Sequence, residues 1–225
     1  MDKVSVLLTS YNKPDFVAEA IESVLDQTYQ NTELIILDDN SSEQTIDVIQ
    51  SYCHHHNVIY WNSHINEADR KTLCRYAWLI NFGVRELSSG HYLTYLADDD
   101  VFYLDRLERM VDYLETHDAQ VVYGNQDIAD IELNIRGVRG GFGVLETGWN
   151  KIDHNSVMHT REVFDRAGGW EDNKGVWGGA DSYFWNRIRD AGYKFYPLEG
   201  ASTDIKRYHE HSVQWLIANG KFFEE

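Results

Sequence analysis

The 225-residue sequence is poor in the residues that would place it in several common classes of protein. It has two cysteines, Cys53 and Cys74, and neither belongs to a Cys-x-x-Cys motif, so we expect free thiols rather than a disulfide framework or a zinc site. The 20 basic residues are outnumbered by 37 acidic ones. Because neutralising phosphates takes clustered lysines and arginines, this balance argues against a nucleic-acid partner.

Long apolar runs are missing as well. No run approaches the roughly 18 to 20 residues of a membrane-spanning helix, and Met1 leads through Asp2 and Lys3 into a short strand-like segment rather than a signal peptide. We therefore expect a soluble cytoplasmic protein without an integral membrane segment. Neither a Gly-x-Gly-x-x-Gly fingerprint nor a Gly-x-x-x-x-Gly-Lys loop occurs, which argues against dehydrogenase and ATPase functions.

The sequence does contain a regular alternation of short apolar runs and helical periodicity. The runs that predict strands are residues 4–8, 34–37, 58–61 and 91–96. Apolar positions from Leu73 to Leu87 step by four and three residues, which predicts one long amphipathic helix over 69–88. Similar spacing predicts helices over about 14–24, 104–114 and 181–191. This alternation favours an α/β fold with a doubly wound, mostly parallel sheet and helices on both faces.

Polar clusters follow three of the predicted strands, and ligands of such sheets bind at the edge where the strands end. The clusters are Thr9–Tyr11, Asp38–Asp39 and Asp98–Asp100. Consecutive aspartates after a buried strand repel one another unless a cation lies between them. Mg²⁺ or Mn²⁺ accepts one or two carboxylates and fills its other positions with water and substrate phosphates. A solvated loop or a helix cap is the alternative for the triplet.

Four side chains near these clusters are candidates for nucleotide contacts. Asp39 can accept a hydrogen bond from a uracil ring or a ribose, although helix capping is its alternative role. Tyr11 can stack on a base. Arg70 and Arg75 lie near the start of the predicted helix over 69–88, and either can meet a diphosphate through a charge-assisted fork or form a surface ion pair.

Four segments together resemble the successive motifs of family 2 inverting glycosyltransferases of GT-A fold. They are Val4–Tyr11 (VSVLLTSY), Leu34–Ser41 (LIILDDNS), Tyr92–Leu107 (YLTYLADDDVFYLDRL) and Gly168–Trp185 (GGWEDNKGVWGGADSYFW). The match spans most of the chain. It extends to Asp153–His159 (DHNSVMH), a segment similar to that of bacterial spore-coat polysaccharide enzymes within the family.

The resemblance implies roles for individual residues. One departure concerns Ala97, which stands where the family has the first aspartate of an Asp-Ser-Asp-Asp string, so the division of labour among Asp98, Asp99 and Asp100 stays open. With that exception, the resemblance implies that Thr9, Tyr11, Asp39 and Arg70 bind the nucleoside and phosphates, Asp98 the ribose and Asp99 the metal, and that Asp181 is the catalytic base.

The chemistry of Asp181 can also be stated from first principles. Inverting transfer needs one carboxylate that takes the proton of an acceptor hydroxyl while a metal holds the departing diphosphate. Asp181 follows a glycine-containing loop and begins a predicted helix, so capping that helix is its alternative role. Trp177 lies in the same loop between Gly175 and Gly178 and is a candidate for stacking on the acceptor.

Residues 208–212 (YHEHS) resemble the family's Tyr-Arg-x-His-x-x-Ser pattern, whose histidine completes the metal shell. Counting back from Ser212 selects His209, with His211 as the rival. A third alternative is that neither histidine is a ligand.

The sequence therefore predicts a metal-dependent inverting glycosyltransferase. It would move a sugar from a UDP-sugar, with UDP-glucose as a plausible donor, to a glycan or other hydroxyl acceptor, and would use Mn²⁺ or Mg²⁺. We expect a single domain, with a nucleotide-sugar-binding half at residues 1–120 and an acceptor-side half at 121–225. The alternatives are nucleotidyl transfer to a sugar phosphate and a non-catalytic nucleotide-sugar-binding module.

Overall fold

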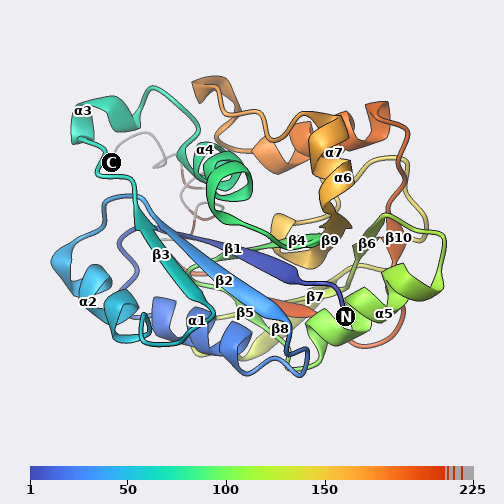
Figure 1. The fold of residues 1–225 in the computed structure, drawn as a ribbon, viewed down its shortest axis with the longest axis horizontal. Helices are drawn as coiled ribbons and strands as arrows, with labels where there is room; N and C mark the ends of the chain where they lie inside the picture. The colour runs from blue at the N-terminus through green and yellow to red at the C-terminus, as the bar shows by residue number, and fades with distance from the viewer. Residues whose placement is uncertain (211, 213–214, 216–218, 220–225) are drawn as a thin grey trace.

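The computed structural model describes residues 1–210, 212, 215 and 219, and its centre is a seven-stranded sheet (Figure 1). The strands are β1 (Val4–Ser10), β2 (Thr32–Asp38), β3 (Val58–Asn62), β4 (Tyr92–Ala97), β6 (Val121–Tyr123), β9 (Val157–Thr160) and β10 (Tyr196–Pro197). Their order across the sheet is β10-β6-β9-β4-β1-β2-β3. All neighbours are parallel except β9, which is antiparallel to both β4 and β6. The predicted mostly parallel sheet is confirmed.

Helices cover both faces of this sheet, as the alternating pattern predicted (Figure 1). One face carries α1 (Val17–Leu25), α2 (Glu43–Ser51) and α5 (Arg106–Thr116). The other carries α4 (Arg75–Phe82), α6 (Arg161–Ala167) and α7 (Ala180–Asp190). Shorter helical elements are α3 (Glu67–Arg70), the π-helix Gly83–Leu87 and the 3-10 helices His154–Ser156 and Lys174–Val176. Every helix in the described part of the chain is too short or too polar to traverse a bilayer.

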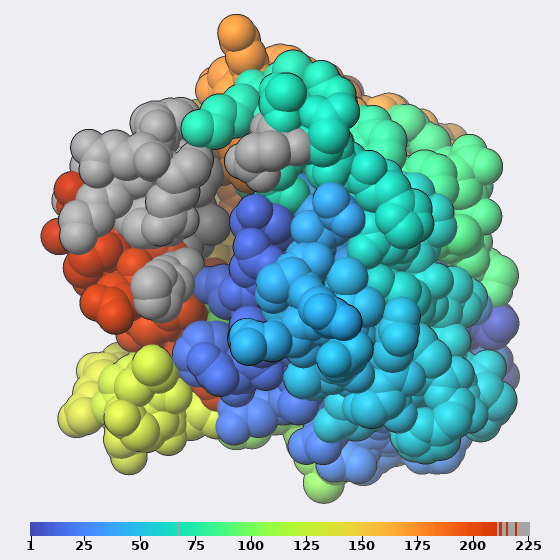
Figure 2. All heavy atoms as spheres, turned by 90° about the vertical axis from the view of Figure 1, so that its left-hand side faces the viewer, coloured from blue at the N-terminus to red at the C-terminus, as the bar shows by residue number. Residues whose placement is uncertain are grey.

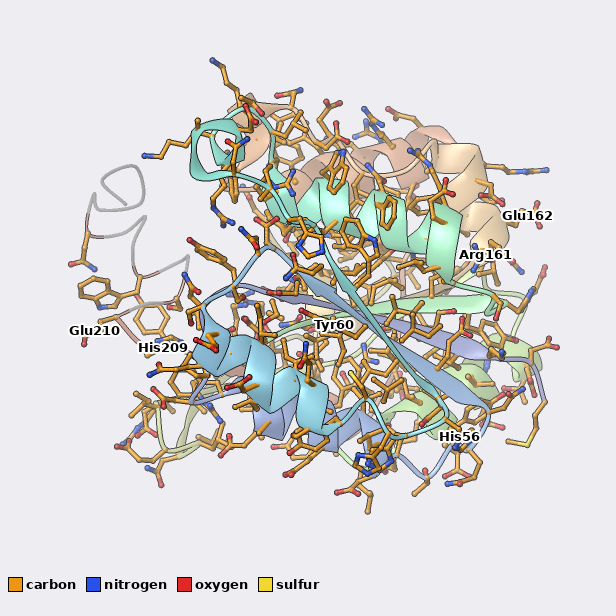
Figure 3. All side chains as sticks on the ribbon, turned by 60° about the vertical axis from the view of Figure 1, so that its left-hand side comes forward. His56, Tyr60, Arg161, Glu162, His209 and Glu210 are labelled. Atoms are coloured by element: carbon orange, nitrogen blue, oxygen red, sulfur yellow. The ribbon has the colours of Figure 1, made fainter. Side chains whose placement is uncertain are left out.

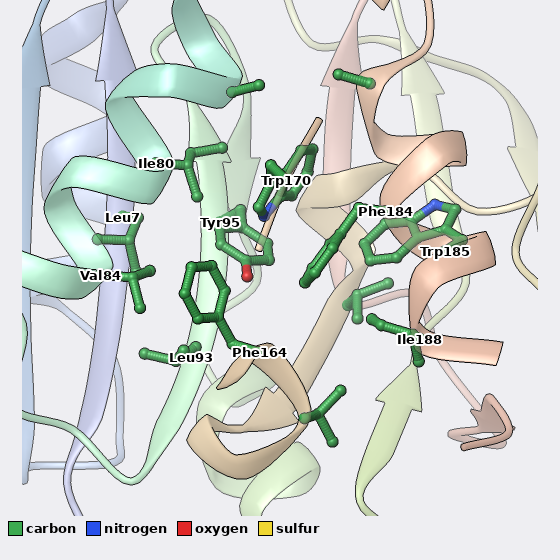
Figure 4. Close-up of a cluster of buried hydrophobic side chains, with 14 of the residues drawn as sticks. Leu7, Ile80, Val84, Leu93, Tyr95, Phe164, Trp170, Phe184, Trp185 and Ile188 are labelled. Atoms are coloured by element: carbon green, nitrogen blue, oxygen red, sulfur yellow. The ribbon is translucent and has the colours of Figure 1, made fainter. Parts of the chain in front are cut away.

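The sheet separates two apolar layers because successive side chains of a strand point to opposite faces. Leu7 and Ile35 pack into the layer under α4, α6 and α7, whereas Leu8 and Ile36 pack into the layer under α1, α2 and α5. All four side chains are fully buried. Figure 4 shows the first layer, where the aromatic rings from β4, α6, α7 and Trp170 meet.

The single long helix predicted over 69–88 is wrong, because the structure breaks it. Residues between α3 and α4 leave the helix, where Leu73 forms an isolated antiparallel bridge with Asn173 and the Cys74 N–H donates to the Asp172 carbonyl. These backbone contacts reach across about a hundred residues, and local periodicity does not report them. The helix resumes at Arg75 and ends in the π-helix. The helix predicted over about 104–114 begins later than expected. Leu104 precedes α5 and is 59% exposed.

A second, four-stranded sheet starts where β4 ends. It contains β5 (Val101–Phe102), β7 (Gln126–Ala129), β8 (Ile135–Arg139) and β11 (Asp204–Arg207), in the order β5-β11-β7-β8. The β7–β8 hairpin stands out from the body below β11, as yellow atoms in Figure 2. Because β5 follows Asp98–Asp100 directly, this sheet brings residues from the C-terminal half to the edge where β1, β2 and β4 end.

Candidate active site

The polar clusters predicted to meet do lie together at the carboxyl ends of β1, β2 and β4. Thr9 pairs in register with Leu37 of β2 and with Ala97 of β4, so the residues that follow these three strands share one rim. The Tyr11 backbone N–H donates to Asp98 Oδ2 at 2.8 Å. The parallel register therefore brings together the first and third clusters.

Asp39 anchors the second cluster. Its carboxylate is 2% exposed and lies 2.7 Å from Arg75 Nη2 and 3.0 Å from Arg70 Nη2. The Arg70 guanidinium carbon also lies 3.5 Å from the centroid of the Tyr11 ring. The sequence left the choice between Arg70 and Arg75 open, and the structure places both on Asp39. The residue that precedes α2 as its N-cap is Ser42.

The three consecutive aspartates have three different environments. Asp98 is 6% exposed, and burial together with the neighbouring charge of Asp99 raises its pKa to about 8. Burial also opposes ionisation of Asp99, but the His209 hydrogen bond and the charge of Lys13 outweigh it and lower the pKa of Asp99. Asp100 is fully buried and accepts a hydrogen bond from the Arg207 N–H at 2.7 Å. The triplet is therefore not a solvated loop.

Asp99 and His209 form the part of the rim best suited to a cation. His209 is 6% exposed, and its Nε2 lies 3.0 Å from Asp99 Oδ2, the same oxygen that Lys13 Nζ approaches at 3.0 Å. In Figure 3, His209 and His56 lie at opposite ends of the sheet. The rival His211 is outside the described residues.

The residues of this rim fit a divalent ion that is held only partly by protein. Within the described ranges, no group of three or more His, Cys, Asp or Glu side chains gathers as a metal site. Mg²⁺ and Mn²⁺ often take one or two carboxylates and draw their other ligands from water and phosphates. Burial, and then the charge of Asp99, raises the pKa of Asp98, and a nearby cation would favour the ionised form of both carboxyls.

Asp181 lies in the first turn of α7, and α7 covers the face of the main sheet opposite to the one that α2 covers. Its Oδ1 accepts a hydrogen bond from the Ser182 N–H at 2.6 Å, while the N-cap position itself is held by Gly179. Burial, and then the charge of Asp153, raises the pKa of Asp181 to about 7. A carboxylate with such a pKa is suited to accept a proton near neutral pH.

A buried lysine connects the aspartate triplet to the surroundings of Asp181. Lys206 of β11 is 6% exposed, and its Nζ lies 3.0 Å from Asp153 Oδ2 and 3.3 Å from Asp100 Oδ2. Arg139 of β8 approaches the same Asp153 oxygen at 3.6 Å. Because Asp153 in turn shifts the pKa of Asp181, one chain of charges runs from Asp100 through Lys206 and Asp153 to the helix α7.

Trp177 follows the 3-10 helix Lys174–Val176 and leads into α7. It is partly buried against the aromatic layer, with its ring centroid 6.3 Å from that of Tyr76. The structure thus places Trp177 near the start of the helix that carries Asp181, where the loop sequence predicted it.

Sequence reasoning missed several residues of the site. Lys13, Tyr76 and Lys206 were given no role, and Asp153 was noted only as part of a resembling segment. Lys13, Tyr76 and Lys206 each contact a residue that is 86 or more positions away in the sequence, so neither spacing nor periodicity points to them. The sequence offered one signal, Lys206, a charged residue close to the His209 motif, which the structure places in the short strand β11.

Comparison with known sequences gives one family match over most of the chain. The family described as Glycosyl transferase family 2 matches residues 5–169. Protein CgeD of Bacillus subtilis is 40% identical over 201 residues, a stretch that covers 84% of this chain and 46% of CgeD. This chain thus spans about half the length of that relative.

Solved structures share the fold at low sequence identity. S. aureus TarS 1–349 in complex with UDP-GlcNAc superposes with a TM-score of 0.73 at 13% identity, covering 93% of this chain and 60% of the TarS 1–349 chain. Mannosyltransferase PcManGT from Pyrobaculum calidifontis, in complex with GDP-Man and Mn²⁺, gives 0.71 at 15% identity, covering 97% and 61%. The predicted GT-A fold is confirmed.

Proposed function

Because this chain belongs to glycosyl transferase family 2, we propose that it transfers a sugar from a UDP-sugar to a hydroxyl acceptor with inversion at the anomeric carbon. One observation carries the proposal. The environments of two carboxylates push their pKa values apart: Asp99 is held ionised beside His209, whereas the pKa of Asp181 is raised to about 7. Such a pair suits a charge-holding role for one and proton transfer for the other.

The donor's nucleotide would occupy the side of the rim formed by β1 and β2. There Tyr11 offers its exposed ring to the base, and Asp39, held by its two arginines, offers carboxylate oxygens to the uracil or ribose. Thr9 and Arg70 would contact the phosphates, and Asp98 the ribose. UDP-GlcNAc bound to TarS supports a UDP-linked donor, and UDP-glucose is one candidate among the sugars.

Asp99 and His209 would hold a Mn²⁺ or Mg²⁺ ion. The Mn²⁺ bound to PcManGT supports this assignment. Bound there, the cation would draw charge from the departing diphosphate. Lys13 Nζ lies 3.0 Å from Asp99 Oδ2 and Asp98 precedes Asp99 in the chain, so both would contribute to the net charge of the rim that the donor meets.

Asp181 would act on the acceptor. A carboxylate oxygen of Asp181 takes the hydroxyl proton, and the acceptor oxygen forms its bond to the anomeric carbon from the side opposite the diphosphate. The bond from the anomeric carbon to the diphosphate oxygen breaks with its electron pair, which leaves UDP. Trp177 would present its ring to the acceptor near this point.

A donor screen tests the proposed reaction. Purified protein with Mn²⁺ and a glycan acceptor is mixed with common UDP-sugars in turn, and released UDP is measured. UDP release that depends on the acceptor supports the proposal. Release of pyrophosphate from UTP and a sugar phosphate would instead indicate nucleotidyl transfer, and binding without any turnover would indicate a non-catalytic module.

UDP binding is expected to require a divalent cation, because the acidic rim would otherwise repel the diphosphate. Calorimetry should give an affinity at least tenfold higher with Mn²⁺ than with EDTA. His209→Ala should reduce that difference, whereas His56→Ala, at the far end of the sheet, should leave it unchanged. Equal affinity in EDTA would contradict the metal assignment.

The rate of transfer should depend on pH through Asp181. The pKa of this carboxyl is raised to about 7, so the proton-accepting form predominates above that pH and is lost below it. With donor and Mn²⁺ saturating, kcat/KM for the acceptor should fall about tenfold per pH unit below pH 7 and level off above it. A profile that is flat from pH 5.5 to 8 would exclude Asp181 as the titrating base.

A further inference from the structure

The N-cap residue of helix α7 supplies no capping side chain. The first N–H groups of a helix have no partner within it and are usually satisfied by an oxygen of the N-cap residue. Here the N-cap is Gly179, which has no side chain. The hydroxyl of Tyr76, from α4, accepts a hydrogen bond from the Ala180 N–H at 3.0 Å. The phenol thus does what a serine or aspartate at Gly179 would otherwise do.

The Tyr76 ring is fixed by three aromatic neighbours. Its centroid lies 6.0 Å from that of His154, 6.1 Å from Trp170 in an edge-on arrangement, and 6.3 Å from Trp177. Burial, and then the charge of Asp181, raise the pKa of Tyr76 well above its usual value, so the oxygen stays a neutral hydroxyl. A neutral hydroxyl held by packed rings gives the Ala180 N–H of α7 an acceptor in a defined place.

The same turn of α4 is tied to both sides of the rim. Cys74 donates its N–H to the Asp172 carbonyl at 2.8 Å, which fastens the loop that leads into α7. Arg75, the next residue, holds Asp39 on the nucleotide side. Tyr76 then holds the first turn of α7. A short stretch of α4 therefore sets the position of the Asp181 backbone relative to the place proposed for the donor.

We propose that Tyr76 is a positioning residue, which caps α7 from α4 and so holds the Asp181 carboxylate where it meets the acceptor hydroxyl. This inference rests on the proposed role of Asp181 as the base. Without the hydroxyl, the Ala180 N–H at the start of α7 loses its acceptor, and the turn that carries Asp181 can shift. Displacements of about 1 Å can cost two orders of magnitude in rate. The donor contacts proposed for Asp39, which Arg75 holds, and for Arg70 stay in place.

The test compares Tyr76→Phe with Tyr183→Phe. Tyr183→Phe removes a hydroxyl from α7 itself, at a residue that is 44% exposed. For Tyr76→Phe we expect kcat to fall by about tenfold or more, with donor KM and UDP affinity within twofold of wild type. Tyr183→Phe should match wild type in all three. A Tyr76→Phe enzyme with kcat within twofold of wild type, or with UDP affinity that falls as far as kcat, would overturn the proposal.

A double-mutant cycle separates positioning from general loss of structure. If Tyr76 acts through Asp181, then adding Tyr76→Phe to Asp181→Asn should lower the residual rate by less than twofold, because the loss is already complete. Losses that multiply would overturn the inference, as would a melting temperature for Tyr76→Phe more than about 15 °C below wild type, since loss of one cap shifts it by only several degrees. A wild-type protein that transfers no sugar would instead refute the proposed function.

Discussion

Asp181→Asn is expected to lower the rate of sugar transfer by about 10²- to 10⁴-fold, the range by which positioned general bases accelerate reactions. Asparagine keeps the size of the side chain and an oxygen that can accept the Ser182 N–H, so α7 should start as before. It cannot take up the acceptor's proton at neutral pH. UDP affinity in Mn²⁺ should stay within about twofold, because Asp181 would meet the acceptor rather than the nucleotide. Initial rates of UDP release and calorimetry measure the two effects.

Asp172→Asn is the matched control for this variant. Asp172 belongs to the same loop, where its backbone carbonyl accepts from Cys74 and its carboxylate from Asn81 at 3.3 Å, and both contacts survive the change to asparagine. We expect less than a fivefold loss of rate. Asp181→Asn with more than a tenth of the wild-type rate, or Asp172→Asn with an equal loss, would remove Asp181 from its proposed role.

Lys206→Met should destabilise the protein by about 3 to 5 kcal/mol, the usual effect of removing one partner from a buried ion pair. The methionine fills a similar volume but leaves Asp153 and Asp100 without the ammonium that lies 3.0 and 3.3 Å from them. Uncompensated carboxylates can protonate, so the loss of unfolding free energy should be smaller at pH 6 than at pH 8. Urea denaturation at the two pH values measures it.

Lys194→Met is the control for this loss of a positive charge. The Lys194 side chain is 49% exposed and pairs with Glu146 at the surface, where such pairs contribute about 0 to 1 kcal/mol. If Lys206→Met is no less stable than Lys194→Met, the ion pairs of Lys206 with Asp153 and Asp100 do not stabilise the fold.

The sheet and most helices were predictable because their signals are local. Runs such as residues 34–37 and the periodicity of 181–191 each depend on a few neighbouring side chains, and the structure places a strand and a helix there. The predicted helix over 69–88 failed because its break depends on Asn173, a partner that no local pattern reveals. Leu104 failed for a simpler reason: an apolar residue just before a helix can continue its spacing without joining its buried face.

The candidate site divides in the same way. The resemblance implied Tyr11, Asp39 and Arg70 as one group, and the structure does bring them into contact. It gave no reason to connect Tyr76 with Asp181 or Lys206 with Asp153, because these pairs are set by how α4 meets α7 and how β11 meets the main sheet. Residue types were readable from the sequence, whereas contacts across layers required the fold.

The antiparallel strand β9 has a consequence for how this architecture can diversify. The chain leaves the main sheet after β6, forms the projecting β7–β8 hairpin, and is brought back at Asp153 and β9. Both ends of this excursion are therefore fixed, one by the sheet and one by the Lys206 ion pair. Because β7 also pairs with β11, we expect that only the turn between β7 and β8, residues 130–134, can change in length while both ends of the excursion stay in place.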